Sequence, residues 1–387
     1  MIRMNGKYNH TEIFADEIDD STRDQIQTFL DCPAFQKSHI AIMPDCHAGE
    51  GACIGFTMIL NGWIIPNIVG VDIGCGVDAY ELGPMDIDYA SLDRFIRENI
   101  PSGFNIRSEI PHIVNSQVFI SLVLNTCDRT NQDFDRVMRS IGTLGGGNHF
   151  IEIDEDPFGN KWLLVHTGSR NFGLKIATYY QDLAREFSKK VFQEKMYPKL
   201  EYLIDYDANS YLCHMGIAQD FATTNRYVIC REVAGYLGHD ITGLYRGGKH
   251  YISSVHNYID MEDKIIRKGA ISAKGNEPVV IPFNMRDGCL IGQGKGNTRY
   301  NCSAPHGSGR VLSRKVAKEI LDINEFTNEM SGIWSSCVQE STLDESPMAY
   351  KDKNTVLKYI EETVTPFMYM KPTYNFKNTT AQTRKGK

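Results

Sequence analysis

The stretch VGVDIGCGV, residues 69–77, places a carboxylate and a thiol three residues apart among glycines and small aliphatic side chains. Glycine lets the backbone turn tightly and approach other groups closely, whereas valine and isoleucine favour buried extended structure. Asp72 and Cys75 are therefore predicted to be buried polar groups. A buried ionisable group needs a partner that offsets its desolvation, and a metal ion suits an Asp/Cys pair. Taken alone, the stretch fits a strand end with one small core cysteine equally well.

The composition is that of a folded, soluble chain. Its 387 residues are 42% hydrophobic and 23% charged, which is enough for a large core. Neither the first residues nor the most apolar stretch, 58–71, forms a run typical of a signal peptide or a membrane span. We therefore expect a cytoplasmic protein without membrane association. The ten cysteines include no CxxC pair and are expected to be free thiols.

The formal net charge of -7 argues against a non-specific nucleic-acid coat protein, because phosphate binding favours a basic surface. A local basic groove stays compatible with this charge. Composition therefore excludes one class of nucleic-acid protein but not a nucleic-acid enzyme.

Hydrophobic spacing predicts an α+β fold. Helices are expected near residues 21–31, 88–99, 131–141, 174–195, 214–236, 311–321 and 354–363. Strands are expected at 39–43, 52–60, 77–82, 149–153, 161–166, 251–255 and 279–282. The two types alternate irregularly, which favours α+β over a doubly wound sheet. We expect mixed sheets surrounded by helices in a single compact domain over 1–377, followed by a disordered polar tail, 378–387.

Four of the eleven histidines occur beside glycine or small polar residues at predicted strand ends: His149, His166, His256 and His306. Rigid scaffolds present reactive groups at such places. Together with Asp72 and Cys75 they supply enough ligands for two metal ions, if the thiolate or a solvent oxygen bridges them. Paired metals stabilise the attacking and leaving oxygens of phosphoryl chemistry. Thiolate and imidazole favour zinc, whereas the carboxylate favours manganese or magnesium, so these residues do not decide the metal.

Glycine-rich loops complete the signature of a phosphoryl-transfer site. GTLGGGN, 142–148, is not a Walker A motif, but its backbone N–H groups could form an anion nest; a simple turn explains it equally well. In HGSGR, 306–310, two glycines expose His306, and Arg310 follows to bind a phosphate. Such a histidine can be a metal ligand, a general base or a covalent nucleophile.

These motifs occur in an order that resembles the RtcB family of RNA-splicing ligases. The matching segments are PDCHAGEG, VGVDIGCG, GGGNHFIE, VHTGSRNFG, SVHNYI, RKGA, GKGN and SAPHGSGR, followed by Lys377 near the end. The resemblance runs from about residue 39 to Lys377. It implies an RtcB-like fold with a central metal and nucleotide cleft.

The resemblance implies an enzyme that uses GTP and two manganese ions per active site. It would join RNA ends bearing a 3′-phosphate or a 2′,3′-cyclic phosphate to 5′-hydroxyl ends, in RNA repair or tRNA splicing. His306 would attack the α-phosphate of GTP and carry GMP as a phosphoramidate. The guanylate would then activate the RNA 3′-phosphate for attack by the 5′-hydroxyl. The resemblance leaves open the need for an activating partner of the archease kind.

The resemblance also implies roles for individual residues. The metal-ligand positions are Asp72, Cys75, His149, His166 and His256, with the cysteine placed to bridge. The positions that hold or adjoin the nucleotide are Asn148, Glu152, Asn257, Asn284, Ser308, Gly309, Tyr350 and Lys377. Lys377 would reach the guanine, and Tyr350 would stack on the base. Cationic positions near phosphates and RNA are Arg170, Lys268, Arg310 and Arg314.

The chain departs from the family pattern in two places. Many members have a segment like IPGSMGTAS where this chain has IPFNMRDGC, residues 281–289. Asn284 and Cys289 replace serines expected to face the nucleotide phosphates, and Arg286 and Asp287 are new. HGSGR carries Ser308 in place of the usual alanine. These changes are typical of a divergent branch suited to RNA repair.

Two other kinds of protein could use the same residues. The first is a binuclear metal-dependent phosphatase or nuclease, in which His306 acts as an acid or a base and no covalent nucleotide forms. The second is a metal-stabilised RNA-binding protein. Structural zinc sites usually draw their ligands from short local spacings, whereas these ligands span more than 180 residues, so this alternative ranks last.

Overall fold

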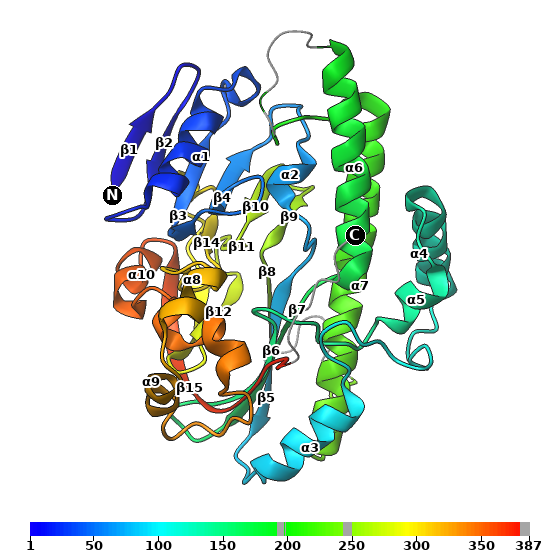
Figure 1. Cartoon of the computed structure of the whole chain (residues 1–387), viewed down its shortest axis with the longest axis vertical. Helices are drawn as coiled ribbons and strands as arrows, with labels where there is room; N and C mark the ends of the chain where they lie inside the picture. Colours follow the sequence, from blue (N-terminus) through cyan, green and yellow to red (C-terminus); the bar gives the residue numbers. More distant parts are fainter. Residues whose placement is uncertain (192–196, 198, 243–249, 380–387) are drawn as a thin grey trace.

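Two β-sheets organise the fold of the computed structural model, which describes residues 1–191, 197, 199–242 and 250–379 (Figure 1). The six-stranded sheet has the order β1 (Ile2–Asn5), β2 (His10–Ile13), β3 (Ile40–His47), β4 (Ile54–Ile59), β10 (Ile265–Lys268), β9 (Asn257–Asp260). The seven-stranded sheet has the order β12 (Pro278–Asn284), β13 (Gly288–Gly294), β15 (Val364–Phe376), β6 (Phe150–Glu155), β7 (Lys161–Thr167), β5 (Gly76–Gly83), β8 (Tyr251–Val255). Strands β11 (Ala270–Ser272) and β14 (Ser303–Pro305) form a separate pair.

Helices surround these sheets. The α-helices are α1 (Asp20–Leu30), α2 (Pro66–Val69), α3 (Tyr89–Asn99), α4 (Gln117–Thr130), α5 (Phe134–Arg139), α6 (Arg170–Val191), α7 (Asp205–Tyr236), α8 (Arg314–Ile320), α9 (Ile323–Glu329) and α10 (Lys353–Ile360). Helices α6 and α7 pack side by side as two long columns along one side of the sheets (Figure 1). The mixture of helices and mostly antiparallel sheets confirms the predicted α+β class. No helix in the described part of the chain has both the length and the apolar character to cross a membrane.

The seven-stranded sheet is buried on both faces at its centre. In β7, Leu163 and Val165 face a core that includes Ile229 and Val233 of α7, while Leu164 belongs to a second core on the other face. Side chains alternate between the faces of a strand, so a strand covered on both sides needs the continuous apolar run WLLV. The central strands are therefore fixed by packing and can hold side chains rigidly at their ends.

Side-chain caps explain where many helices begin. The side chains of Asp19, Asp88 and Ser313 accept hydrogen bonds from backbone N–H groups in the first turns of α1, α3 and α8. These groups have no partner within the helix, so a capping carboxylate or hydroxyl stabilises that end. The predictions for these three helices are confirmed.

Other boundaries differ from the prediction. The helix expected at 174–195 begins at Arg170, and residues 192–196 lie outside the described part. The helix expected at 214–236 begins at Asp205, and the one expected at 131–141 is the shorter α5. Helix α4 was not predicted, since exposed apolar residues such as Val118 and Leu124 obscure its periodicity. The expected disorder of 380–387 also falls on residues outside the described part.

The largest omission of the prediction is β15, a thirteen-residue strand in the middle of the seven-stranded sheet. Proline cannot donate to a β-ladder, so a segment that contains Pro366 and Pro372 is not typical of a central strand. The structure accommodates Pro372 at a register shift between β15 and β6, and another shift interrupts the β13 ladder at Ile291/Gly292 beside Pro366. The prediction also missed the seven-residue β13 and six strands of only three or four residues: β1, β2, β9, β10, β11 and β14.

Candidate active site

The predicted metal ligands gather at one end of four adjacent strands. Asp72 and Cys75 lie on the turn between α2 and β5, so the predicted extended structure begins only at Gly76. His166 lies near the end of β7, His149 directly precedes β6, and His256 directly follows β8. Because β6, β7, β5 and β8 are neighbours in the sheet, residues far apart in sequence meet at its edge.

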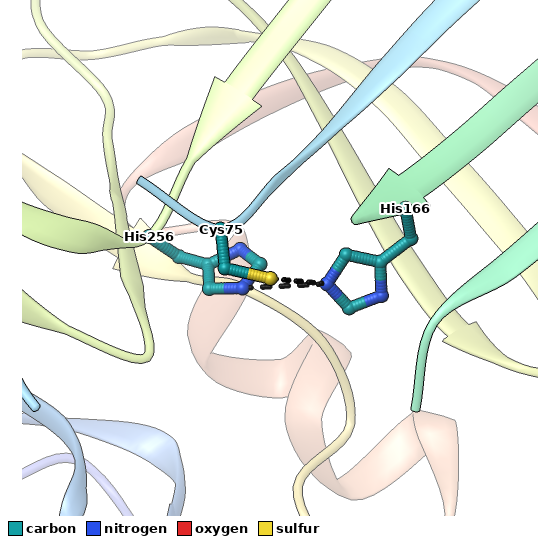
Figure 2. A group of neighbouring side chains, drawn as sticks. All are labelled: Cys75, His166 and His256. Carbon is teal, nitrogen blue, oxygen red and sulfur yellow. Dashed lines mark hydrogen bonds between the residues drawn. The ribbon is translucent and has the colours of Figure 1, made fainter. Parts of the chain in front are cut away.

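Two groups of ligand atoms share the thiol. Cys75 Sγ lies 3.2 Å from His166 Nε2 and 3.5 Å from His149 Nε2. His256 Nε2 is 3.4 Å from His166 Nε2, which completes one group (Figure 2). Asp72 Oδ2 is 3.1 Å from His149 Nε2, which completes the other. In each group the potential ligand atoms lie within 4.8 Å of one another, and Cys75 is the residue that the two groups share.

The protonation states of these side chains leave lone pairs that can bind a metal cation. The backbone carbonyls of Leu144 and Asn148 lie 2.9 Å and 3.2 Å from Nδ1 of His149 and His166. A carbonyl only accepts, so each Nδ1 carries the proton, and Nε2 faces the cluster. Burial lowers the pKa of His166 and His256 well below its ordinary value and keeps both rings neutral. Their facing nitrogens and the thiol hold too few protons to satisfy every lone pair, whereas a divalent cation suits this O, N, S donor set.

The turn that carries Asp72 requires a glycine opposite it. A Cβ atom on Gly168 would lie 2.1 Å from Asp72 Oδ1, which is impossible without movement. The Cys75 side chain is buried as predicted, with 1% exposure, whereas that of Asp72 keeps 34%. One carboxylate edge of the ligand set therefore faces solvent.

His306 is held by a buried carboxylate. Asp45 Oδ2 lies 2.6 Å from His306 Nδ1 and also accepts from the His306 backbone N–H at 3.2 Å. The Asp45 side chain is fully buried at the β3 end. The pair leaves Nε2 as the free ring nitrogen, and the His306 ring centroid is 4.7 Å from that of the metal-ligand candidate His256. Gly309 has a φ of +73°, and a Cβ there would clash with the Asp45 carbonyl at 2.1 Å.

A cleft of about 1320 Å³ opens beside His306. Eleven of the predicted site residues line it: Asn148, Glu152, His166, Asn284, His306, Ser308, Gly309, Arg310, Arg314, Tyr350 and Lys377. The structure thus brings the expected nucleophile and most of the expected nucleotide contacts to one cavity. The remaining ligand candidates, Asp72, Cys75, His149 and His256, do not line this cleft.

Three predicted phosphate or nucleotide contacts lie outside the cleft wall. Asn257 donates to the Asp72 carbonyl at 3.1 Å and accepts from the Gly269 N–H at 3.0 Å, so it braces the ligand turn. Arg170 donates to Thr143 Oγ1 and the Gly103 carbonyl at 3.1 Å and 2.8 Å.

Lys268 is buried, with its ammonium bonded to the backbone carbonyl of Glu50. Burial lowers the pKa of Lys268 to about 8. These contacts occupy the lysine within the protein, away from the cleft wall.

Residues 281–289, which differ from the family pattern, lie in two different environments. Cys289 is fully buried, and its Sγ contacts Asp154 Oδ2 at 3.3 Å, so it does not face the cleft as expected. Asn284 does line the cleft, but its amide donates to Asp287 Oδ2 at 2.7 Å. Arg286 donates to Asp287 at 2.9 Å and also contacts Glu329. The new charged residues therefore pair with one another.

Asp45 and Glu345 were not predicted from the sequence. Glu345 is buried at the end of a 3-10 helix, Glu340–Glu345, and Lys377 Nζ lies 3.0 Å from its Oε2. Tyr350 donates to the same carboxylate at 2.8 Å, and Arg314 also contacts it. Burial alone would raise the pKa of Glu345. The positive charges of Lys377, Arg314 and Arg310 instead hold this pKa far below its ordinary value. A carboxylate thus orders the cationic wall of the cleft.

Two further histidines, His47 of the PDCHAGEG motif and His214 on α7, take structural positions. His47 lines the cleft, where Nδ1 lies 2.9 Å from the Asp45 carbonyl and 3.5 Å from the Arg310 backbone nitrogen. A carbonyl only accepts, so the shorter contact makes Nδ1 a donor, and His47 stabilises the β3 end beside the HGSGR loop. His214 pairs with the Tyr180 hydroxyl at 2.7 Å between α7 and α6, away from the cleft wall.

Comparison with known proteins identifies the family. The family model described as tRNA-splicing ligase RtcB matches residues 25–378. The RNA-splicing ligase RtcB of Escherichia coli strain K12 is 31% identical over 357 residues, covering 84% of this chain and 86% of that protein. The tRNA-splicing ligases RtcB of Nanoarchaeum equitans and Methanococcus maripaludis are 28% and 24% identical, covering 84% and 92% of this chain and 84% and 90% of those proteins. The chain therefore belongs to the RtcB family.

Proposed function

We propose that this protein is an RNA ligase that uses GTP and two manganese ions. It joins RNA ends bearing a 3′-phosphate or a 2′,3′-cyclic phosphate to 5′-hydroxyl ends, in RNA repair or tRNA splicing. Membership of the RtcB family supports ligation of RNA ends, since the relatives are described as RNA-splicing and tRNA-splicing ligases.

The observation that carries the proposal is the placement of His306. Its Nδ1 is 2.6 Å from the buried Asp45 carboxylate, so Nε2 is the nitrogen available for attack. A carboxylate that orients an imidazole and stabilises its positive charge makes the other nitrogen a better nucleophile. Nε2 of His306 would form a bond to the α-phosphorus of GTP while pyrophosphate leaves.

Water would first open a 2′,3′-cyclic phosphate to a 3′-phosphate. The guanylyl group would then pass from His306 to the RNA 3′-phosphate. Attack by the 5′-hydroxyl on this activated end forms the new phosphodiester and releases GMP. Arg310 and Arg314 line the same cleft and would steady the negative charge of the phosphates. Two manganese ions, held by Asp72, Cys75, His149, His166 and His256, would polarise phosphate oxygens and neutralise their charge.

The physiological RNA and an archease-type activator stay predictions. The departure at residues 281–289 supports a divergent branch, because Asn284, which lines the cleft, forms a network with Arg286 and Asp287. An RNA repair role agrees with this divergence.

The test is retention of label on the denatured protein after incubation with manganese and GTP labelled at the α-phosphate. We expect acid-labile, alkali-stable label on the wild type and none on His306→Ala. His214→Ala is the matched control, because that histidine lies between helices away from the cleft wall. It should retain the label.

Absence of label from folded, metal-loaded wild type would overturn the histidyl-GMP mechanism. Hydrolysis of an RNA 3′-phosphate or cleavage of RNA by the same unlabelled sample would instead support the binuclear hydrolase. Both measurements use the full chain.

A further inference from the structure

An asparagine that the sequence did not single out lines the cleft beside His306. Asn375 on β15 is the register partner of Glu152 on β6, and both residues line the cleft. The Asn375 side chain is buried, with a relative exposure of 1%. Burial of a carboxamide is costly unless both its donor and its acceptor find partners.

The hydrogen bonds fix the orientation of this amide. Asn375 Nδ2 donates to Glu152 Oε2; Glu152 gives its own proton to the hydrogen bond with Asp154, so it acts as the acceptor towards Asn375. Asn375 Oδ1 is left without a hydrogen-bond partner among the described residues. The free group at this position is therefore an acceptor, aligned by Glu152.

Glu152 is itself engaged from two sides. It shares a hydrogen bond with Asp154, which in turn contacts Cys289 Sγ at 3.3 Å. Burial and the neighbouring Asp154 carboxylate raise the pKa of Glu152 well above its ordinary value. This buried network holds Glu152 in place, and Glu152 holds the amide of Asn375.

A donor lies two residues further along the same segment. Lys377 lines the cleft, and its Nζ is 3.3 Å from the Asn148 carbonyl and 3.0 Å from Glu345 Oε2. The cleft end thus presents an amide acceptor and an ammonium donor on alternate residues. A guanine-type edge, with N–H donors beside a carbonyl, complements this pair, whereas the adenine edge has an acceptor at N1.

We propose that Asn375 is a specificity-determining residue whose Oδ1 accepts a hydrogen bond from an N–H of the guanine edge. The inference rests on the proposed function, because it names the nucleotide base that enters the His306 cleft. It assigns Asn375 a direct base contact and gives Glu152 the task of aligning it.

The test compares Asn375→Leu with the wild type in the rate of protein labelling from α-labelled GTP, ITP and ATP. Leucine is close in volume but has no acceptor. We expect the rate constant for GTP to fall about 10- to 100-fold, because a buried donor of the base loses its partner. The rate constant for ATP should not fall in parallel, so discrimination between GTP and ATP decreases.

ITP identifies the donor. A fall for GTP alone assigns the 2-amino group, and an equal fall for GTP and ITP assigns N1–H; both results support the inference. The matched control is Asn160→Leu, since the Asn160 amide also donates to a carboxylate, Asp156 at 2.9 Å, but does not line the cleft. It should leave all three rates unchanged.

Parallel falls for all three nucleotides, or unchanged rates, would overturn the assignment of Asn375. Both outcomes differ from failure of the proposed function, in which the wild type itself acquires no label. Thermal unfolding of each variant checks the fold, and the direct Kd of GMP and AMP measures base selectivity without turnover.

Discussion

Arg226 Nε lies 2.8 Å from Asp78 Oδ1, and neither side chain is exposed. The same guanidinium donates to the Gly74 carbonyl at 2.9 Å and the Thr167 carbonyl at 3.2 Å. Gly74 lies between Asp72 and Cys75, and Thr167 follows His166. One arginine on α7 therefore joins the two backbone segments that carry the shared thiol and the central imidazole.

Replacing Arg226 should lower the free energy of unfolding. Arg226→Met leaves Asp78 buried without its cation, and removal of one partner from a buried pair costs about 3–5 kcal/mol. Urea unfolding should show this loss. The double variant Arg226→Met/Asp78→Asn should recover part of it, because no uncompensated charge is left. A loss below about 1 kcal/mol would contradict a structural role for the pair, being the size expected of an exposed pair.

Metal binding should depend unequally on the ligands. Cys75 belongs to both ligand groups, whereas His149 and His256 each belong to one. If both proposed manganese ions bind there, Cys75→Ser should weaken the binding of both, whereas His149→Ala or His256→Ala should mainly weaken the binding of one. Equilibrium dialysis with metal analysis measures this stoichiometry, with the exposed Cys213→Ser as control. Equal losses in Cys75→Ser and His256→Ala would exclude the bridge.

The sequence predicts the candidate metal ligands better than it predicts the residues that line the neighbouring cleft. Asp72, Cys75 and the histidines occur at glycine-rich strand ends, where few conformations are available, and these residues do converge. Glu345 occurs in an acidic segment, ESTLDE, whose composition is typical of a solvated surface. Its burial follows from Lys377, which arrives from a distant part of the chain. Such a long-range partner leaves no local signal.

Orientation is the other property that the sequence does not contain. Lys268 and Arg170 are cationic, as a phosphate site requires, but backbone carbonyls hold both within the protein. Cys289 stands where a cleft residue was expected, yet the β12–β13 register turns it towards Asp154. Alternation along a strand decides which face a side chain takes, and a bulge between Pro282 and Asn284 changes that alternation.

Lys268 gives a pH dependence of stability with a defined sign. Its folded pKa is about 8, whereas the ordinary value is 10.5, so between these values the unfolded chain binds more protons. Lys268 should therefore make a contribution to the free energy of unfolding that rises with pH from about 8 to 10.5, by about 3 kcal/mol in total, whereas the buried thiols of Cys46 and Cys127, whose pKa values burial raises, contribute the opposite slope.

Lys268→Met should remove this contribution, so the difference in free energy of unfolding between wild type and variant should change by about 3 kcal/mol across this pH range. Denaturant unfolding at pH 7.5 and pH 10 measures it, and the exposed Lys264→Met serves as control. The same slope in wild type and Lys268→Met would show that the lysine keeps its proton throughout.

Loss of the Asp45 charge should slow the reaction without weakening metal binding. Asp45→Asn keeps the size of the side chain but removes the negative charge beside His306 Nδ1, where an imidazolium-like charge develops as Nε2 forms its bond. Loss of the comparable carboxylate in a catalytic triad costs about 10⁴-fold in kcat. We expect the single-turnover rate of labelling from GTP to fall at least about 100-fold, with the manganese content unchanged. Asp45→Asn should still reach full labelling at long times, unlike His306→Ala, because the nucleophile is present. A fall in bound manganese that matches the fall in rate would instead assign Asp45 to the metal site.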